Sequence, residues 1–470
     1  MKPDFKKLER AFNPKCIAII GDKKAGNYMW CRSHANFKGK LYSVQIDPGE
    51  IPGIEELGVK NYLSLMDIPE PVDLAIVAVP RQVTPRILDD CIRKDVAAAH
   101  FYTAGFSESD TDEGIALENL LIEKSAKANF HLVGPNCMGI FNPSIGVGQG
   151  AAFNEIPAGP VGLISQSGMH AGTFIRESHL MGLDVSKAVS YGNGTVLDSP
   201  DYLEFFGNDP SIKAIGMYVE GVRDGKRFLD VLKDVSARKP VVIWKGGRTE
   251  QGERASASHT KTLSVAGGVW ESVVRQGGAL SVSSMEELID TIKALVYMPE
   301  VAGPGVGVTG GSGGQSVVIA DVITEAGLEV PPLTEKSYDK MASFFDLIGG
   351  AFKNPVDTAN TNRERMKPIM EVLVGDDNIN TLMLLMNARS GPGGQSDEQI
   401  NNIIEIKKNT TKPVMVVLSW SFSPEGVEKA GEITMKLREG GVPAFITPER
   451  GAFALRKVLD YYILKQSIKP

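Results

Sequence analysis

The chain has 470 residues, a formal net charge of −7 and 42% hydrophobic residues. This length predicts about three domains, and the acidic balance without a basic stripe argues against nucleic-acid binding. No apolar run approaches the length of a membrane span, and the N-terminus lacks the apolar core of a signal peptide, so we expect a cytoplasmic protein without membrane attachment. The four cysteines are far apart in the sequence, which favours reduced thiols over disulfides or a metal site.

Residues 1–140 alternate apolar, strand-like runs with amphipathic, helix-like runs. This alternation predicts an α/β domain, Rossmann-like, with a parallel sheet covered by helices on both faces. The predicted strands are Cys16–Gly21, Leu41–Ile46, Leu74–Val79, Ala98–Thr103 and His131–Gly134. Helices are predicted at Pro85–Lys94 and Glu113–Asn129.

Short turns of small residues, prolines or polar residues follow several of these strands. Ligands in such sheets bind outside the carboxyl ends of the strands, so these turns outline a predicted site. The turns are Gly21, Asp22, Lys23, Lys24 and Gly26, then Val79 and Pro80, then Thr103, Ala104 and Gly105, and finally Gly134-Pro135-Asn136. The first turn is a candidate for a nucleotide diphosphate, although Lys23 replaces a glycine of the dinucleotide fingerprint. Asp47 holds the approximate place of the ribose-binding acid of NAD-binding folds, which leaves an NAD-dependent oxidoreductase as one interpretation.

Two segments rich in glycine and proline, 142–160 and 299–305, are typical of linkers. They predict domains at 1–141, 160–298 and 305–470. The second and third domains each open with a strand, a Gly/Ser turn and a helix, which suggests two related flavodoxin-like folds. The supporting elements are the strands Val161–Ile164, Val306–Thr309, Thr381–Met386 and Val414–Leu418 and the helix Glu449–Lys465.

The opening turns of these two domains are candidate phosphate sites. A helix N-terminus presents unpaired N–H groups and a partial positive charge, and glycine lets the backbone approach an anion. The candidate residues are Ser165, Gln166, Ser167 and Gly168 in the second domain and Gly310, Gly311, Ser312, Gly313 and Gly314 in the third. Gly and Ser also occupy such turns for steric reasons alone. The third-domain turn is not a P-loop, because Gln315-Ser316 follows it in place of Lys-Ser/Thr.

His259 stands in a small, polar, non-periodic run between the predicted strand Val241–Lys245 and the predicted helix Gly268–Gln276. We therefore expect it on a loop, where a rigid scaffold can position it for chemistry. Glu220 ends an apolar strand and is suited to hold one ring nitrogen of a histidine while the other reacts. The alternatives are a solvated histidine and an ordinary surface carboxylate.

Taken together, six motifs resemble the α subunit of ADP-forming acyl-CoA synthetases, which are relatives of succinyl-CoA synthetase. They are Ser165-Gln166-Ser167-Gly168, Tyr218-Val219-Glu220-Gly221, Gly247-Arg248-Thr249-Glu250, Ser258-His259-Thr260, the glycine turn at 310–314 and Lys353-Asn354-Pro355-Val356-Asp357. The resemblance covers essentially the whole chain in the family's domain order. It implies a CoA-binding domain followed by two flavodoxin-like domains. It also implies an ATP-grasp β subunit that holds ATP or ADP with Mg²⁺, and a heterotetramer of the two kinds of chain.

By this resemblance the chain is an acid–thiol ligase that interconverts a small carboxylic acid, CoA and ATP with acyl-CoA, ADP and phosphate. The reaction passes through an acyl-phosphate and a phosphohistidine at His259, with Glu220 orienting the ring. The turns at 165–168 and 310–314 would hold the phosphoryl group, and CoA would lie across the turns at 21–26, 79–80 and 103–105. The acyl pocket would lie near Met169, His170 and Gly172, and no metal site is expected in this chain.

The sequence departs from the family pattern at several positions. Lys261 and Val265 stand where glycines commonly follow the histidine, Asp22 replaces a small residue, and Asp47-Pro48 replaces a stretch that often carries a basic residue. These changes motivate an alternative from another class, a non-catalytic CoA-binding or regulatory homologue with altered loops.

Overall fold

The structure is a computed structural model that describes residues 3–150, 153, 155–260, 267–345, 353–358, 365–388, 397–420 and 423–468. Two compact units divide the chain. The first contains residues 1–179 and 184–283, and the second contains residues 180–183 and 284–470. The first unit therefore holds the predicted first domain and most of the second, whose residues 180–183 and 284–298 belong to the second unit. The three-domain division stays a prediction.

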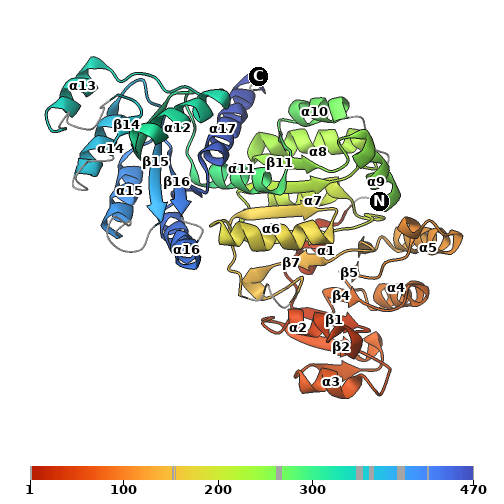
Figure 1. Ribbon diagram of the computed structural model, residues 1–470. Coiled ribbons are helices and arrows are strands. Elements are labelled where there is room, and N and C mark those ends of the chain that lie inside the picture. Colours follow the sequence, from red (N-terminus) through yellow and green to blue (C-terminus); the bar gives the residue numbers. More distant parts are fainter. Residues whose placement is uncertain are drawn as a thin grey trace. The chain divides into compact units, whose positions relative to one another are not determined.

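The first sheet, drawn in red and orange in Figure 1, has six parallel strands in the order β3-β2-β1-β4-β5-β6. This is the order of a Rossmann fold. The strands are β1 (Cys16–Ile20), β2 (Lys40–Val44), β3 (Lys60–Tyr62), β4 (Leu74–Val77), β5 (Ala98–Phe101) and β6 (His131–Val133). The helices are α1 (Phe5–Phe12), α2 (Met29–Ser33), α3 (Ile51–Glu56), α4 (Thr84–Arg93) and α5 (Asp112–Ala128). The five predicted strands are confirmed to within one or two residues, whereas the short strand β3 was not predicted.

Local sequence signals set the ends of the longest helix of this region, α5. The Thr111 side chain accepts a hydrogen bond from the Gly114 N–H at 3.1 Å, which satisfies one of the free donors of the first turn. Asn129 adopts a left-handed conformation with φ of 46° and ends the helix. The helix thus returns the chain to β6 and to the turn that follows it.

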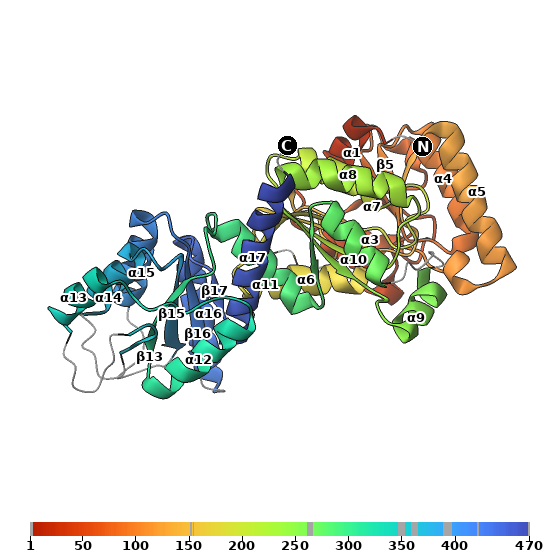
Figure 2. The ribbon, with the colours of Figure 1, turned by 90° about the horizontal axis from the view of Figure 1, so that it is seen from above.

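The second sheet has the order β12-β11-β10-β8-β9-β7, and its first five strands are parallel in the flavodoxin-like order. The edge strand β7 pairs antiparallel with β9. The strands are β7 (Gly139–Phe141), β8 (Val161–Ser165), β9 (Val185–Ser190), β10 (Ala214–Val219), β11 (Val241–Lys245) and β12 (Leu280–Val282). The helices, seen from a second side in Figure 2, are α6 (Gly168–Leu180), α7 (Ser199–Asn208), α8 (Gly225–Arg238), α9 (Glu250–Thr260) and α10 (Gly267–Gln276).

The helix α9 corrects the prediction that His259 lies on a loop. Residues 250–260 are helical, and His259 is the penultimate residue of the helix. The segment contains Glu250, Glu253, Arg254, Ala255 and Ala257, residue types that favour helix. Thr249 caps it by accepting the Gly252 N–H at 3.1 Å. The Glu250–Arg254 pair adds i,i+4 support. Much of the helix is exposed, so apolar residues do not recur every three to four positions along it. That recurrence is the signal by which a helix is predicted from sequence, and its absence explains why this helix was missed.

The second unit contains a five-stranded parallel sheet in the order β14-β13-β15-β16-β17. This is again a flavodoxin-like order, so the predicted fold class is confirmed. The strands are β13 (Val306–Gly311), β14 (Val356–Asp357), β15 (Thr381–Ala388), β16 (Val414–Trp420) and β17 (Ala444–Phe445). The helices are α11 (Met285–Tyr297), α12 (Gly313–Glu325), α13 (Glu335–Ala342), α14 (Met366–Gly375), α15 (Asp397–Asn409), α16 (Pro424–Glu439) and α17 (Pro448–Ile468).

One apolar core joins the two sheets of the first unit. The ring of Phe12 in α1 lies 5.1 Å from Phe205 and 5.4 Å from Phe206, both in α7. Tyr191 and Tyr202 extend the same cluster. Aromatic side chains contribute the largest buried areas in a core, so this contact holds the Rossmann-like and flavodoxin-like halves together.

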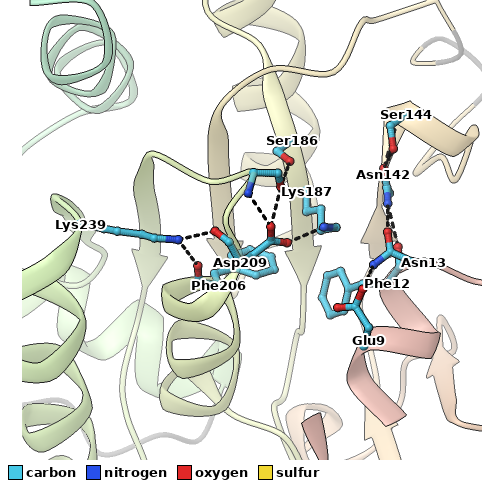
Figure 3. Close-up of polar contacts among 11 residues, drawn as sticks. Glu9, Phe12, Asn13, Asn142, Ser144, Ser186, Lys187, Phe206, Asp209 and Lys239 are labelled. Carbon is cyan, nitrogen blue, oxygen red and sulfur yellow. Dashed lines mark hydrogen bonds and ion pairs between the residues drawn. The ribbon is translucent and has the colours of Figure 1, made fainter. Parts of the chain in front are cut away.

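A polar anchor near this core fixes the C-terminal end of α1, as Figure 3 shows. The Asn142 side-chain amide donates to the Phe12 carbonyl at 2.9 Å and to Asn13 Oδ1 at 3.0 Å. The Asn142 side-chain oxygen accepts from the Ser144 hydroxyl at 2.6 Å. Because Asn142 follows β7, these bonds tie α1 to the second sheet of the unit.

Within the described residues, no helix is long and apolar enough to cross a membrane.

Candidate functional site

Three of the sequence-predicted turns lie side by side at the carboxyl edge of the first sheet. A Cβ added to Gly21 would lie 2.6 Å from Val79 Cγ1, and Gly21 has φ of +85°, so this close approach needs glycine. The Thr103 hydroxyl donates to the Val79 carbonyl at 2.6 Å. The structure therefore brings together the turns after β1, β4 and β5, as the strand pattern predicts.

The side chains of the first turn divide into two groups. Lys23 and Lys24 are exposed to solvent, whereas Asp22 is buried with 4% of its surface accessible. Gly26 is open, with no atom within 4 Å of an added Cβ. The exposed ammonium groups are placed to meet an anionic ligand at this edge, and the buried carboxylate is not.

A pocket of 260 Å³ lies where the carboxyl edges of the two sheets of the first unit meet. Its walls come from the ends of β5, β6 and β9 and from the N-terminus of α6. The lining residues are Tyr102, Asn136, Cys137, Met138, Gln166, Ser167, Gly168, Met169, Gly192 and Asn193. Both the edge of the first sheet and the predicted phosphate turn thus contribute to one cavity.

The N-terminus of α6 supplies the anion-binding part of this pocket. The N–H groups of Gly168 and Met169 have no acceptor among the described residues, while the His170 N–H donates to the Ser167 hydroxyl at 3.3 Å. Free N–H groups at a helix start attract anions. Met138 lies so close to Gly168 that an added Cβ would meet its Cγ at 2.7 Å, so the position needs glycine.

The other two residues of the predicted phosphate turn support the backbone. Ser165 is buried, and its hydroxyl donates to the Ser167 carbonyl at 2.6 Å. The side-chain oxygen of Gln166 accepts from the Glu220 N–H at 2.7 Å and from the Gly221 N–H at 3.2 Å. Gln166 therefore lines the pocket while fixing the position of Glu220.

Sequence reasoning missed Asn193, which a polar network holds at the pocket. Its side-chain nitrogen donates to Glu108 Oε2 at 2.6 Å and to Glu118 Oε2 at 2.9 Å. Glu108 also accepts from the Gly105 N–H at 2.6 Å, so the network joins the pocket to the third predicted turn. Tyr191-Gly192-Asn193-Gly194 is another glycine turn after a strand, and the rule that found the other turns would have found it.

We predict that Asn193→Asp destabilises the protein strongly, because it sets a third carboxylate against two others at a buried position. The expected loss is about 2–4 kcal/mol of unfolding free energy near pH 8. The deficit should shrink toward pH 5, since protonation removes the repulsion. Urea unfolding of the full chain measures both effects. Asn208→Asp makes the same change at an exposed position and should alter stability by less than about 0.5 kcal/mol. Equal stability of the Asn193 variant and the natural protein would contradict the network.

Glu220 lies in a cluster of titratable and aromatic side chains at the end of β10. It is 6% exposed, and the Tyr218 hydroxyl donates to its Oε1 at 3.1 Å. Burial, and secondly the negative charge of Glu220, raise the pKa of Tyr218. The His170 ring packs on Tyr218 and on Trp244, at centroid distances of 4.4 and 4.8 Å. Burial lowers the pKa of His170 despite the opposing charge of Glu220, which favours a neutral ring.

The backbone of the His259 helix lies near this edge of the unit. Gly246 and Gly247 connect β11 to α9, and the Lys245 ammonium donates to the Glu220 carbonyl at 2.7 Å. The helix lies beside the 3-10 turn Ser107–Ser109, which follows the third predicted turn. The side chain of His259 falls outside the described residues, so its pairing with Glu220 stays a prediction.

The second predicted phosphate turn belongs to the second unit. Gly310 and Gly311 end β13, and α12 begins at Gly313. Gly310 has φ of +100°, and an added Cβ would meet the Leu385 carbonyl oxygen at 2.2 Å. The Ser312 N–H donates to Gln315 Oε1 at 3.0 Å, which caps the helix. The turn is a well-formed helix start, and its meeting with the 165–168 turn stays a prediction.

Cys137 lines the pocket and is buried. Burial raises the pKa of Cys137, so its thiol is a poor nucleophile. Among the described residues, no group of three or more His, Cys, Asp or Glu side chains is arranged to hold a metal ion.

Comparison with known families agrees with this architecture. Residues 15–143 match the CoA binding domain family, and residues 158–295 match the succinyl-CoA ligase like flavodoxin domain family. The chain is 33% identical to the α subunit of acetate–CoA ligase [ADP-forming] II from Pyrococcus furiosus over 455 residues, which cover 95% of this chain and 96% of that subunit. The chain belongs to the family of ADP-forming acyl-CoA synthetases.

Other relatives of the chain differ in length. Acetate–CoA ligase [ADP-forming] I from Archaeoglobus fulgidus is 33% identical over 462 residues, which cover 97% of this chain and 64% of that protein. A solved structure of acetyl-coenzyme A synthetase 1 from Ca. Korarchaeum cryptofilum, in complex with phosphate and ADP, has a TM-score of 0.85 and 28% identity. That match covers 98% of this chain and 99% of the other chain. The chain thus spans less than two thirds of the Archaeoglobus ligase, and nearly all of the Pyrococcus α subunit.

Proposed function

We propose that this chain is the α subunit of an ADP-forming acyl-CoA synthetase. In the direction of ATP formation, acyl-CoA and phosphate give an acyl-phosphate and free CoA. The phosphoryl group moves from the acyl-phosphate to His259, which releases the acid, and then passes to ADP. Synthesis of acyl-CoA runs the same steps in reverse. Relatives that bear the name acetate–CoA ligase support this activity.

One observation carries the proposal. The pocket joins the carboxyl edge of the CoA-binding sheet, through Tyr102 and Asn136, to the free N–H groups at the start of α6. A thiol delivered along the first sheet and a phosphoryl group held at the helix would therefore meet in one cavity. Fixed N–H dipoles of this kind stabilise developing negative charge without reorganisation.

The edge of the first sheet offers surfaces that fit CoA. Lys23 and Lys24 provide exposed cations for its phosphates. Ile46 and Leu63, at the ends of β2 and β3, are 73% and 65% exposed and fit an adenine ring. When bound there, CoA supplies the thiol that accepts the acyl group.

His259 is proposed as the phosphoryl carrier, and Glu220 as the residue that orients its ring. A neutral imidazole is a good nucleophile, and a carboxylate on its other nitrogen sets the tautomer. The phosphoryl group would rest at Ser167 and Gly168, with the glycine turn at 310–314 as the second helix start.

A partner with an ATP-grasp fold is proposed to hold ATP or ADP with Mg²⁺, in a heterotetramer with two copies of each chain. The glycine turn of the third sheet lacks the Lys-Ser/Thr of a P-loop. The Archaeoglobus ligase contains a further segment that this chain does not cover. We place the protein in the cytoplasm, with a small carboxylic acid as its substrate.

A second candidate is a non-catalytic CoA-binding or regulatory homologue. It rests on Lys261 and Val265, which lie outside the described residues, and on the buried carboxylate of Asp22. The presence of His259, Glu220 and an open pocket favours the enzyme.

Reconstitution tests the proposal. Mixed with an ATP-grasp β subunit, Mg²⁺ and labelled ATP, the chain should acquire an acid-labile, base-stable phosphate and release it on addition of ADP. The isolated chain should not become labelled. Labelling of the isolated chain would contradict the two-subunit proposal, whereas CoA binding without labelling in the complex would favour the non-catalytic homologue.

A further inference from the structure

The N–H groups of the first turn already have acceptors within the chain. The turn extends from Lys23 to Tyr28, and five of its six N–H groups donate to oxygens of this protein. The acceptors for Gly26, Asn27 and Tyr28 are the carbonyls of Lys23 and Lys24, at 2.8–3.1 Å. A nucleotide diphosphate bound by backbone amides needs free N–H groups, and this turn has few to offer.

The remaining two of these five bonds go to carboxylates. Asp22 Oδ1 accepts from the Lys23 N–H at 3.1 Å, and its Oδ2 accepts from the Cys31 N–H at 2.8 Å. Glu50 Oε2, from the start of α3, accepts from the Lys24 N–H at 2.7 Å. Two negatively charged groups therefore hold the N–H groups that a phosphate would otherwise use.

The two carboxylates are held in different ways. Asp22 is buried, and Gln45 donates to its backbone carbonyl at 2.9 Å. Burial raises the pKa of Asp22, while its bonds from Cys31 and Lys23 oppose that change. Glu50 is half-buried, and its bond to Lys24 is exposed to solvent. Asp22 is thus a fixed part of the turn, and Glu50 is a group that an incoming anion can displace.

We propose that Asp22 and Glu50 compete with the CoA diphosphate for the N–H groups of this turn and thereby set a weak affinity for CoA. The inference rests on the proposed function, because it assumes that CoA binds across this edge. The phosphates then depend on the ammonium groups of Lys23 and Lys24, which extend from the same turn. The negative charge of the two carboxylates opposes binding, and Glu50 must release the Lys24 N–H for the backbone to contribute.

Isosteric neutral variants test this proposal. Each variant removes one negative charge. Glu50→Gln keeps an oxygen that can accept the Lys24 N–H, whereas Asp22→Asn keeps only one of the two oxygens that accept the Lys23 and Cys31 N–H groups. Calorimetric titration of CoA into the full chain at low salt should show a Kd lowered about three- to tenfold for each variant. For Glu50→Gln the gain should disappear at about 1 M salt, because an exposed charge is screened there.

The matched control is Glu56→Gln, which makes the same change of net charge in the last turn of the same helix, at an exposed position with no bond to the turn. Its Kd should equal that of the natural protein. Thermal unfolding checks that each variant is folded. If Asp22→Asn does not fold, Glu50→Gln alone still tests the proposal.

Three results would overturn the inference. An unchanged or weakened affinity in Glu50→Gln, with CoA binding in the natural protein, overturns this inference alone. Equal tightening by Glu56→Gln also overturns it, because the effect would then follow net charge and not the turn. Absence of CoA binding in the natural protein and in both variants overturns the proposed CoA function together with the inference.

Discussion

Replacement of His259 by alanine is expected to abolish labelling of the chain from ATP in the complex with an ATP-grasp subunit. Acyl-CoA formation that depends on ATP should fall by at least about three orders of magnitude, because loss of a covalent nucleophile removes an obligatory intermediate. The measurements are the acid-labile phosphate on the chain and the rate of acyl-CoA formation. The fold should persist, since the change is a single side chain in a helix whose residues Glu250, Gln251, Arg254 and Ala255 are exposed.

His170→Asn is the informative control for this variant. Among the described residues, His170 has Glu220 in its charge environment, and burial against Tyr218 and Trp244 lowers the pKa of its ring. The control should retain the label on His259. A label that persists in His259→Ala and disappears in His170→Asn would contradict the proposed carrier and assign the role to α6.

Replacement of Glu220 by glutamine is expected to lower the yield of phosphohistidine by about 10- to 100-fold without unfolding the protein. The side chain is buried, so its negative charge is poorly screened and acts strongly on a neighbouring imidazole. A neutral amide keeps the shape but no longer stabilises the positive charge of the phosphorylated ring. The measurement is the labelled fraction at equilibrium with fixed ATP and ADP.

Tyr218→Phe separates charge from hydrogen bonding at the same carboxylate. It removes the 3.1 Å bond to Glu220 and leaves the charge in place, so its effect should be several-fold smaller. Full labelling of Glu220→Gln would show that the carboxylate does not act on the phosphorylated histidine. Equal losses in both variants would indicate that the bond to Tyr218 matters and the charge does not.

Several parts of the architecture were predictable because they depend on local pattern. Buried parallel strands are continuous apolar runs, so β1, β4 and β8 are visible in the sequence, and glycine marks the turns after β1 and β8, where a side chain would collide. Gly21 and Gly168 are such positions, since an added Cβ would lie 2.6 and 2.7 Å from Val79 and Met138. The short strand β3 escaped prediction because its three residues are exposed or half-buried and carry no apolar run.

The sequence by itself determined the fold class, the carboxyl-edge turns and the residue types suited to phosphoryl transfer. The helix α9 was missed because it lacks an apolar period, although its capping is local. Only the tertiary structure decided that Asn193 reaches the pocket and that Asp22 and Glu50 occupy the N–H groups of the first turn. The physical reason is the range of the interactions. Helix capping and strand burial act between near neighbours, whereas Lys24 and Glu50 are 26 residues apart, and Glu118 and Asn193 are 75 residues apart. No local pattern encodes such pairs, because each exists only after the sheets have packed.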